Sequence, residues 1–170
     1  MFKGHEYAVT GVTFSSNGRS LISTSGNGYV RIWNMRDGSW KVLRATAGSR
    51  GYFLSVTFSP DERYVVAGDL DGSIWIWDSR THKLVARWQG HMNDVWHAES
   101  TPYVGRVAFT PDGKGLVSGS GDQTVKYWNV SSLGSRQGAS RVVNEERFPL
   151  MRRVMKHDVC RVFLLPCNVD

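Results

Sequence analysis

FSSNGRSLISTSGNGYVRIWN, at positions 14–34, returns twice in altered form along the chain. The second copy is FSPDERYVVAGDLDGSIWIWD at 58–78, and the third is FTPDGKGLVSGSGDQTVKYWN at 109–129. Each copy separates its first phenylalanine from its closing tryptophan by 19 residues, and the closing tryptophans lie 44 and 51 residues apart. A period of about 40–45 residues is typical of four-stranded propeller blades. The repeats therefore predict an all-β fold of the β-propeller class.

Each repeat contains a short run of β-branched and aromatic residues, as an inner strand should. The runs cover 9–14, 54–59 and 107–110, and such residues suit the half-buried surface of a strand. Asn27-Gly28 and Asp71-Gly72 stand where a later hairpin turn is needed, because these dipeptides adopt positive φ angles with little strain. The local signals predict short antiparallel strands in every repeat.

The repeats divide the chain into units at about 1–45, 46–89 and 90–130. We expect a linker with a candidate outer strand at 131–155, and the truncated start of a fourth repeat at 156–170. The whole is then an incomplete arc of about three four-stranded blades plus the start of a fourth. An arc leaves apolar blade faces open that a closed propeller would cover, so we also expect self-association through those faces.

Two kinds of dipeptide resemble the signature of the WD40 family. Gly-His occurs at Gly4-His5 and Gly90-His91, and each repeat closes with Trp-Asn or Trp-Asp. The resemblance covers about residues 1–130 and implies a buried tetrad of His, Ser/Thr, Asp and Trp in each full repeat. The positions that it assigns to this tetrad are His5, Ser23, Trp33, Asp71, Trp77, His91, Ser118, Asp122 and Trp128.

Only the third repeat carries the whole implied tetrad. Asn27 replaces the aspartate of the first repeat, and the second has Ala67 at the serine position and no Gly-His. In the family, the imidazole links the carboxylate to the hydroxyl, which accepts a hydrogen bond from the indole N–H. Because buried polar groups are tolerable only when paired, we expect the second repeat to be the least rigid.

The third repeat also departs from the common spacing. Phe14 follows His5 by nine positions, but Phe109 follows His91 by eighteen. The alignment places the extra residues, 97–105, inside the inner strand, although a bulge accommodates only one. Three alternatives remain: the segment loops out as a functional protrusion, the strand re-pairs through Tyr103-Val104 with Val95-Trp96 displaced, or the segment is a splicing artefact.

Catalytic, metal and cofactor sites are not expected. His91, Ser118 and Asp122 match a hydrolase triad in type, but the pattern recurs in register with tryptophan, whereas a catalytic constellation occurs once. His91 with His97, and Cys160 with Cys167, lack zinc-site spacing. The glycines lack a phosphate-loop pattern. We therefore predict a protein that is not an enzyme and needs no metal or cofactor.

Charge and hydropathy add weaker indications. The chain has a net charge of +6, divided as +3 over residues 1–130 and +3 over 131–170, without a continuous Lys/Arg block. This balance favours acidic partners but predicts no direct contact with nucleic acid. No apolar stretch approaches the roughly 18 residues that span a membrane, and the N-terminus does not resemble a signal peptide. We expect no membrane partner, and free thiols at the two cysteines.

Loops that lead into the inner strands should converge with the next hairpin turns on one face of a propeller. The residues that we expect there as partner-binding residues are Tyr7, Arg50, Leu70, Asn93 and Trp96. Aromatic and arginine side chains are frequent anchors of protein interfaces. The pattern thus predicts a face for binding other proteins.

Several phrases resemble one branch of the family. WNMRDGSWKVL at 33–43, VAGDLDG at 66–72 and GKGLVSGS at 113–120 are similar to the C-terminal propeller of fungal Tup/Groucho-type transcriptional corepressors. This resemblance implies a scaffold that binds short segments of repressor or chromatin-associated proteins, in the nucleus or the cytoplasm, with the nucleus favoured. The alternatives are a ubiquitin-ligase substrate receptor, a G-protein-β-like scaffold and a non-functional gene-model fragment.

Overall fold

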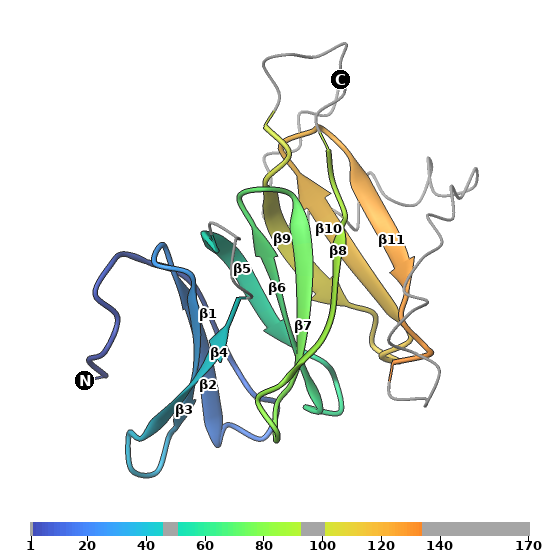
Figure 1. Cartoon of the computed structure of the whole chain (residues 1–170). Helices are drawn as coiled ribbons and strands as arrows, with labels where there is room; N and C mark the ends of the chain where they lie inside the picture. Colours follow the sequence, from blue (N-terminus) through green and yellow to red (C-terminus); the bar gives the residue numbers. More distant parts are fainter. Residues whose placement is uncertain (1, 46–50, 93–100, 134–170) are drawn as a thin grey trace, which may run out of the picture.

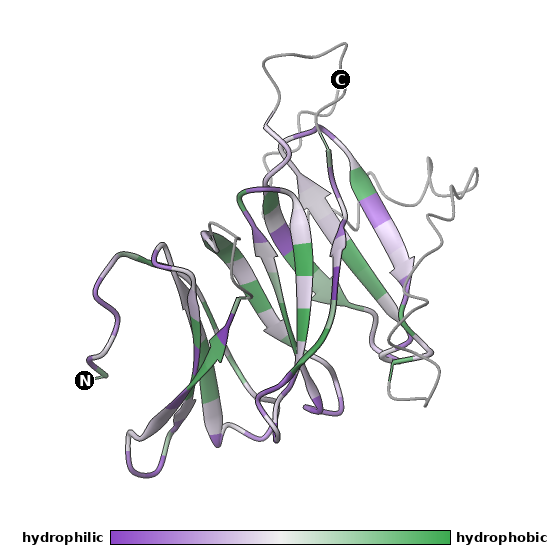
Figure 2. Cartoon of the chain, in the orientation of Figure 1, coloured by the Kyte–Doolittle hydropathy of each residue, from purple (hydrophilic) through white to green (hydrophobic). Residues whose placement is uncertain are grey.

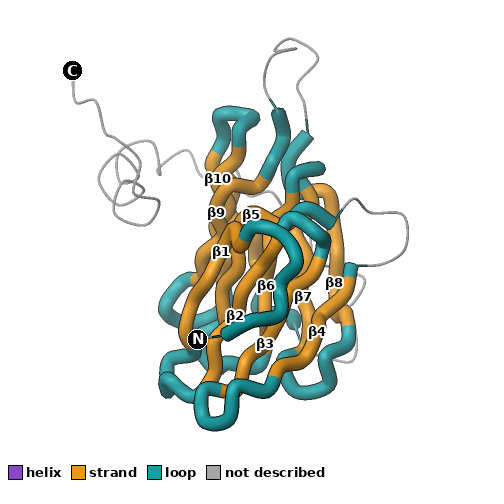
Figure 3. Tube along the Cα trace, turned by 90° about the vertical axis from the view of Figure 1, so that its left-hand side faces the viewer, coloured by secondary structure: helices purple, strands orange, loops and turns teal. Residues whose placement is uncertain are grey.

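The computed structural model describes residues 2–45, 51–92 and 101–133 of the chain. These residues form strands joined by turns and loops, with no helix among them and hence none that could span a membrane (Figure 3). The first four strands are β1 (Val9–Phe14), β2 (Ser20–Ser25), β3 (Tyr29–Asn34) and β4 (Trp40–Arg44). The next four are β5 (Phe53–Phe58), β6 (Tyr64–Asp69), β7 (Ser73–Asp78) and β8 (Leu84–Gln89). The last three are β9 (Val104–Phe109), β10 (Gly115–Ser120) and β11 (Val125–Asn129).

The strands form three antiparallel sheets, each a meander in chain order, which we call blades 1, 2 and 3 (Figure 1). Blades 1 and 2 have four strands each, and the described part of blade 3 has three. The expected turns hold, with Gly28 at φ 80° and Gly72 at φ 85°. In blade 3 the same turn uses Gln123 at φ 67°. The all-β arc of propeller blades is confirmed for the described residues.

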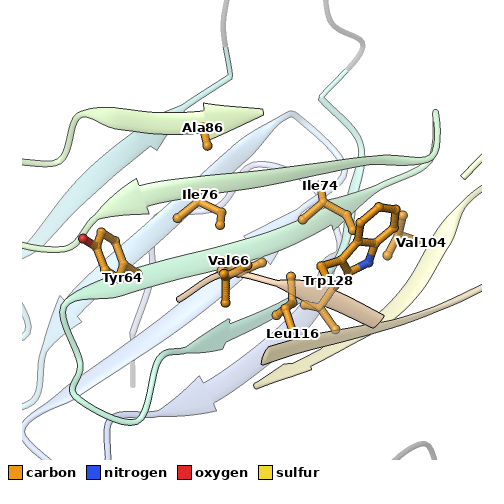
Figure 4. Close-up of a cluster of buried hydrophobic side chains, with 10 residues drawn as sticks. Tyr64, Val66, Ile74, Ile76, Ala86, Val104, Leu116 and Trp128 are labelled. Atoms are coloured by element: carbon orange, nitrogen blue, oxygen red, sulfur yellow. The ribbon is translucent and has the colours of Figure 1, made fainter. Parts of the chain in front are cut away.

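The blades pack face to face, with their inner strands β1, β5 and β9 adjacent. Successive side chains along the strands of blade 2 point alternately toward blade 1 and toward blade 3, because side chains alternate along a strand. Val65 and Trp75 join the core against blade 1, while Val66 and Ile74 join the core against blade 3. Figure 4 shows the core between blades 2 and 3. Blade 2 is thereby covered on both faces, and every residue of β6 is buried.

The inner strand of blade 3 is continuous, so the expectation that residues 97–105 interrupt it is wrong. Val104 pairs with Ser120, as Val9 pairs with Ser25 in blade 1, and the same bulge follows. Val104 takes this place because it is apolar and fills a fully buried site in the core. Of the three alternatives, the structure follows re-pairing through Val104. Val104 and Gly105 are thus the first two residues of β9 rather than part of an interruption, and Val95-Trp96 lies outside the described residues.

Residues 134–170 also lie outside the described residues. This range contains most of the expected linker, the candidate outer strand, Cys160, Cys167 and the expected start of a fourth repeat. Those expectations therefore remain predictions.

Candidate interaction face

Blade 3 contains a continuous relay of buried polar groups. Trp128 Nε1 donates to Ser118 Oγ at 2.8 Å, Ser118 Oγ lies 2.7 Å from His91 Nε2, and His91 Nδ1 lies 2.8 Å from Asp122 Oδ2. A consistent assignment has Ser118 donating to Nε2 and Nδ1–H donating to the carboxylate. Burial acts to raise the pKa of Asp122, but hydrogen bonds from Thr124 and His91 hold it below its usual value.

The same groups could be mistaken for a hydrolytic triad, but their burial argues otherwise. His91 and Ser118 are both 0% exposed, so the serine hydroxyl is closed to any substrate. The relay instead ties the segment around His91 to the turn at Asp122, which lies at one end of the blade. The role of the relay is therefore to hold these two loops in position.

Blade 1 contains a variant of this relay in which the two hydrogen bonds of the histidine are reversed. Trp33 Nε1 donates to Ser23 Oγ at 2.7 Å, and His5 Nε2 also lies 2.7 Å from that oxygen. Arg31, rather than a carboxylate, lies 2.6 Å from His5 Nδ1. Because a guanidinium can only donate, His5 must be neutral and protonated on Nε2. Burial and the neighbouring Arg31 lower the pKa of His5 to about 4.

The aspartate expected in the first repeat is Asn27, and its side chain makes no hydrogen bond within the described residues, although both polar atoms are buried. Arg31 thus occupies the place at His5 that Asp122 holds at His91.

Blade 2 replaces the relay with a different pair. Trp75 Nε1 donates to Asp69 Oδ2 at 2.7 Å, while Trp77 Nε1 donates to the Arg44 carbonyl of blade 1 at 3.1 Å. The backbone N–H groups of Ser73 and Asp71 donate to the other Asp69 oxygen. The fully buried carboxylate of this blade is therefore Asp69, two residues before the expected Asp71. Burial raises the pKa of Asp69 despite these bonds.

Asp71 was assigned to the tetrad because it aligns with Asp122 of the third repeat, and the pairing of Asp69 with Trp75 was therefore missed. A signal was present, since blade 2 alone has a second tryptophan two residues before its closing one. The two indoles stack with centroids 6.0 Å apart and planes 9° from parallel. The lower rigidity expected for this repeat remains a prediction.

One end of the arc, uppermost in Figure 1, brings together the loops that we expected to bind partners. In each blade, the N–H of a residue in the second hairpin turn donates to the carbonyl of the residue just before the inner strand. These pairs are Gly26 with Ala8, Leu70 with Tyr52, and Gly121 with Tyr103, at 3.3, 2.9 and 3.1 Å. The backbone thereby holds both loops of every blade at the same end, which we call the loop face.

Large side chains are exposed on this loop face. Tyr7 is 65% exposed and Leu70 40%, so the structure places both expected residues at the surface. Tyr52 and Tyr103, at 38% and 37%, lie there too. A Cβ added at Gly26 would come within 2.7 Å of the Tyr52 ring, so that ring lies against the turn of the neighbouring blade.

Sequence reasoning missed Tyr52 and Tyr103. Both tyrosines directly precede an inner strand, β5 or β9. This shared position was not recognised because the alignment treated Tyr103 as part of the extra residues 97–105. Arg50, Asn93 and Trp96 lie outside the described residues. Within the described ranges, no group of three or more His, Cys, Asp or Glu side chains is placed to hold a metal ion.

The chain matches a family of repeats and a solved structure with the same fold. The family model described as "WD domain, G-beta repeat" matches residues 1–34, 40–78 and 82–129. The solved structure "Crystal structure of RRP9 WD40 repeats" aligns with a TM-score of 0.68 at 23% identity, over 78% of this chain and 38% of that one. At that identity the likeness shows the fold alone.

Two curated relatives are similar in sequence. The WD repeat-containing protein 3 homolog of Dictyostelium discoideum is 29% identical over 140 residues, covering 82% of this chain and 13% of its own length. The transcriptional repressor rco-1 of Neurospora crassa is 40% identical over 94 residues, covering 55% of this chain and 15% of its own. This chain thus spans less than a sixth of either relative.

Proposed function

Because the chain belongs to the WD40 family of WD domain, G-beta repeats, we propose that it is a non-catalytic scaffold for protein–protein interactions. The observation that carries this proposal is the loop face, where Tyr7, Tyr52, Leu70 and Tyr103 lie exposed on backbone that is held by hydrogen bonds. Aromatic anchors on a preorganised surface lose little conformational entropy when a partner binds. The closed, fully buried serine of blade 3 supports the absence of catalysis.

The finer part of the proposal is a role related to transcriptional corepression. It is supported by the phrases shared with Tup/Groucho-type propellers and by the similarity to the transcriptional repressor rco-1. On this proposal the loop face binds short segments of repressor or chromatin-associated proteins, and the protein acts in the nucleus. Nucleic acid and membranes are not direct partners.

A different adaptor role is the competing proposal. The chain aligns with the repeats of RRP9 as well as with a repressor, so the fold is compatible with other adaptor roles, such as a ubiquitin-ligase substrate receptor or a G-protein-β-like scaffold. The identity of the captured proteins separates these roles.

Affinity capture with the whole chain tests both levels. We expect the unaltered protein to retain repressor or chromatin factors, and a Tyr7→Ala, Tyr52→Ala, Tyr103→Ala variant to lose them. Val12→Ala, an exposed apolar position on β1 away from the loops, is the matched control. Recovery of ligase subunits would replace the corepressor role, and full retention by the triple variant would exclude the loop face. Thermal melting of each variant verifies that it is folded.

A further inference from the structure

A second candidate surface lies at the opposite end of blade 1 from the loop face. Here the β1–β2 and β3–β4 turns lie together, joined by a hydrogen bond from Met35 N to the Arg19 carbonyl at 2.9 Å. Around them is a depression of about 880 Å³, which we call the blade 1 groove; its lining includes Arg19, Arg36, Trp40 and Lys41. Figure 2 shows hydrophilic residues at the β3–β4 turn beside it.

The charge of the blade 1 groove has one sign. Arg19, Arg36 and Lys41 are all exposed, and no carboxylate is among the lining residues. None of the three cations forms an ion pair within the part of the chain that the structure describes. The groove therefore presents three positively charged side chains that are available to pair with acidic groups of a ligand.

Two carboxylates close to the turns in sequence or through hydrogen bonds, Asp37 and Glu62, offset only part of this charge. Asp37 accepts hydrogen bonds from Ser39 N and Asn34 Nδ2, and Glu62 accepts hydrogen bonds from Asn17. Both carboxylates lie outside the lining. Arg19 does lie close enough to Glu62 to help lower the pKa of that carboxyl, after the larger effects of Ser16 and Asn17. Both carboxylates keep their charge, but neither forms an ion pair with Arg36 or Lys41, so the lining itself stays positive.

An apolar anchor accompanies the charge. Trp40 is 42% exposed, and its ring is held from two sides: Arg31 lies 4.5 Å from its centroid, and the Trp33 ring centroid lies 6.1 Å away. A tryptophan fixed in this way offers rigid contact area for an apolar side chain. The blade 1 groove thus combines a hydrophobic contact with a basic rim.

We propose that the blade 1 groove binds an acidic protein segment that carries an apolar side chain, its carboxylates on Arg36 and Lys41 and its apolar residue on Trp40. Complementary charge on the rim steers such a segment and fixes its orientation. The surface is distinct from the loop face, so the two sites bind different segments.

The corresponding hairpin of blade 2 supplies a matched control. It carries Arg80 and Lys83, but Asp78 sits beside them and Leu84 takes the register position of Trp40. Its basic residues alone should not form the site.

Fluorescence anisotropy with a labelled octapeptide of glutamates around one leucine tests the proposal on the whole chain. We expect binding that weakens between about 0.05 and about 0.3 M salt, because exposed charges are screened. Arg36→Glu with Lys41→Glu should weaken it by about tenfold or more, and Trp40→Ala by about fivefold, as expected for rim charges and an aromatic anchor. Arg80→Glu with Lys83→Glu should leave it unchanged.

Equal loss in the blade 2 control, or no binding of the peptide, would overturn the proposal. Tighter binding of a single-stranded RNA of equal length would also overturn it, since the same charges would then serve a nucleic acid. The tyrosine variant of the loop face should bind the peptide normally, so failure here is distinguishable from failure of the proposed scaffold role.

Discussion

Ser118→Ala is the most informative single change in the relay of blade 3. The hydroxyl accepts from Trp128 Nε1 and bonds His91 Nε2, and both partners are buried, at 4% and 0% exposure. Its removal leaves two polar groups without this partner, each worth about 1–3 kcal/mol when buried and unsatisfied. We therefore expect the free energy of unfolding to fall by about 3 kcal/mol, a large share of the 5–15 kcal/mol typical of domains.

Urea denaturation followed by tryptophan fluorescence measures this loss, with the slope of the transition expected to stay constant. Ser23→Ala in blade 1 is the matched control. Its histidine, His5, is partly exposed, so water can satisfy the freed nitrogen, and the loss should be smaller, about 1–2 kcal/mol. A loss below about 1 kcal/mol for Ser118→Ala would refute the reasoning. It would mean that Trp128 finds another acceptor, as Trp77 does with the Arg44 carbonyl.

Three further outcomes can be measured. His5 has a pKa lowered to about 4, so between about pH 6.5 and 4 the unfolded chain binds a proton that the folded chain does not. The contribution of His5 to stability should be complete above this window and fall as the pH drops through it. NMR titration should show that Arg31→Met raises the pKa of His5, and an unchanged pKa would contradict the role of Arg31. Tyr64 is buried, and its hydroxyl has no partner within the described residues; Tyr64→Phe should therefore leave the urea midpoint unchanged or raise it, and a loss above about 1 kcal/mol would contradict this. Phe14 is 59% exposed on β1, so Phe14→Glu should shift the chain from oligomer to monomer in light scattering, a prediction that a monomeric unaltered chain would exclude.

Much of the fold follows from local chemistry. Turn residues such as Asn27-Gly28, and the alternation of β-branched and aromatic residues, predict the strands because they act through neighbouring residues alone. The start of β9 could not be found in this way. Val104 falls within the residues 97–105 that the alignment treats as extra, and only its burial in the core between blades 2 and 3 shows that it begins the strand.

The functional residues were predictable to a similar degree. Tyr7 and Leu70 follow from the convergence of loops in a propeller. Asp69 does not, because its role depends on Trp75 reaching across from β7, a contact between paired strands that register with Asp122 does not reveal. The groove around Trp40 also needs the folded hairpin, since its lining comes from turns that are separate in the sequence.

Blade 2 shows why loss of the relay need not mean loss of order. Phe53, Trp75 and Trp77 are all fully buried, and their ring centroids lie 5.6 to 6.0 Å apart. Burial of one large apolar side chain contributes about 1.5–3 kcal/mol, whereas a typical hydrogen bond contributes about 1 kcal/mol net. Phe53 and Trp75, which have no aromatic counterpart in the other two blades, therefore stabilise this blade at least as strongly as the missing relay bonds would. The relay matters more in blade 3, where it fixes His91, the last described anchor before the extra residues, to the turn that carries Asp122.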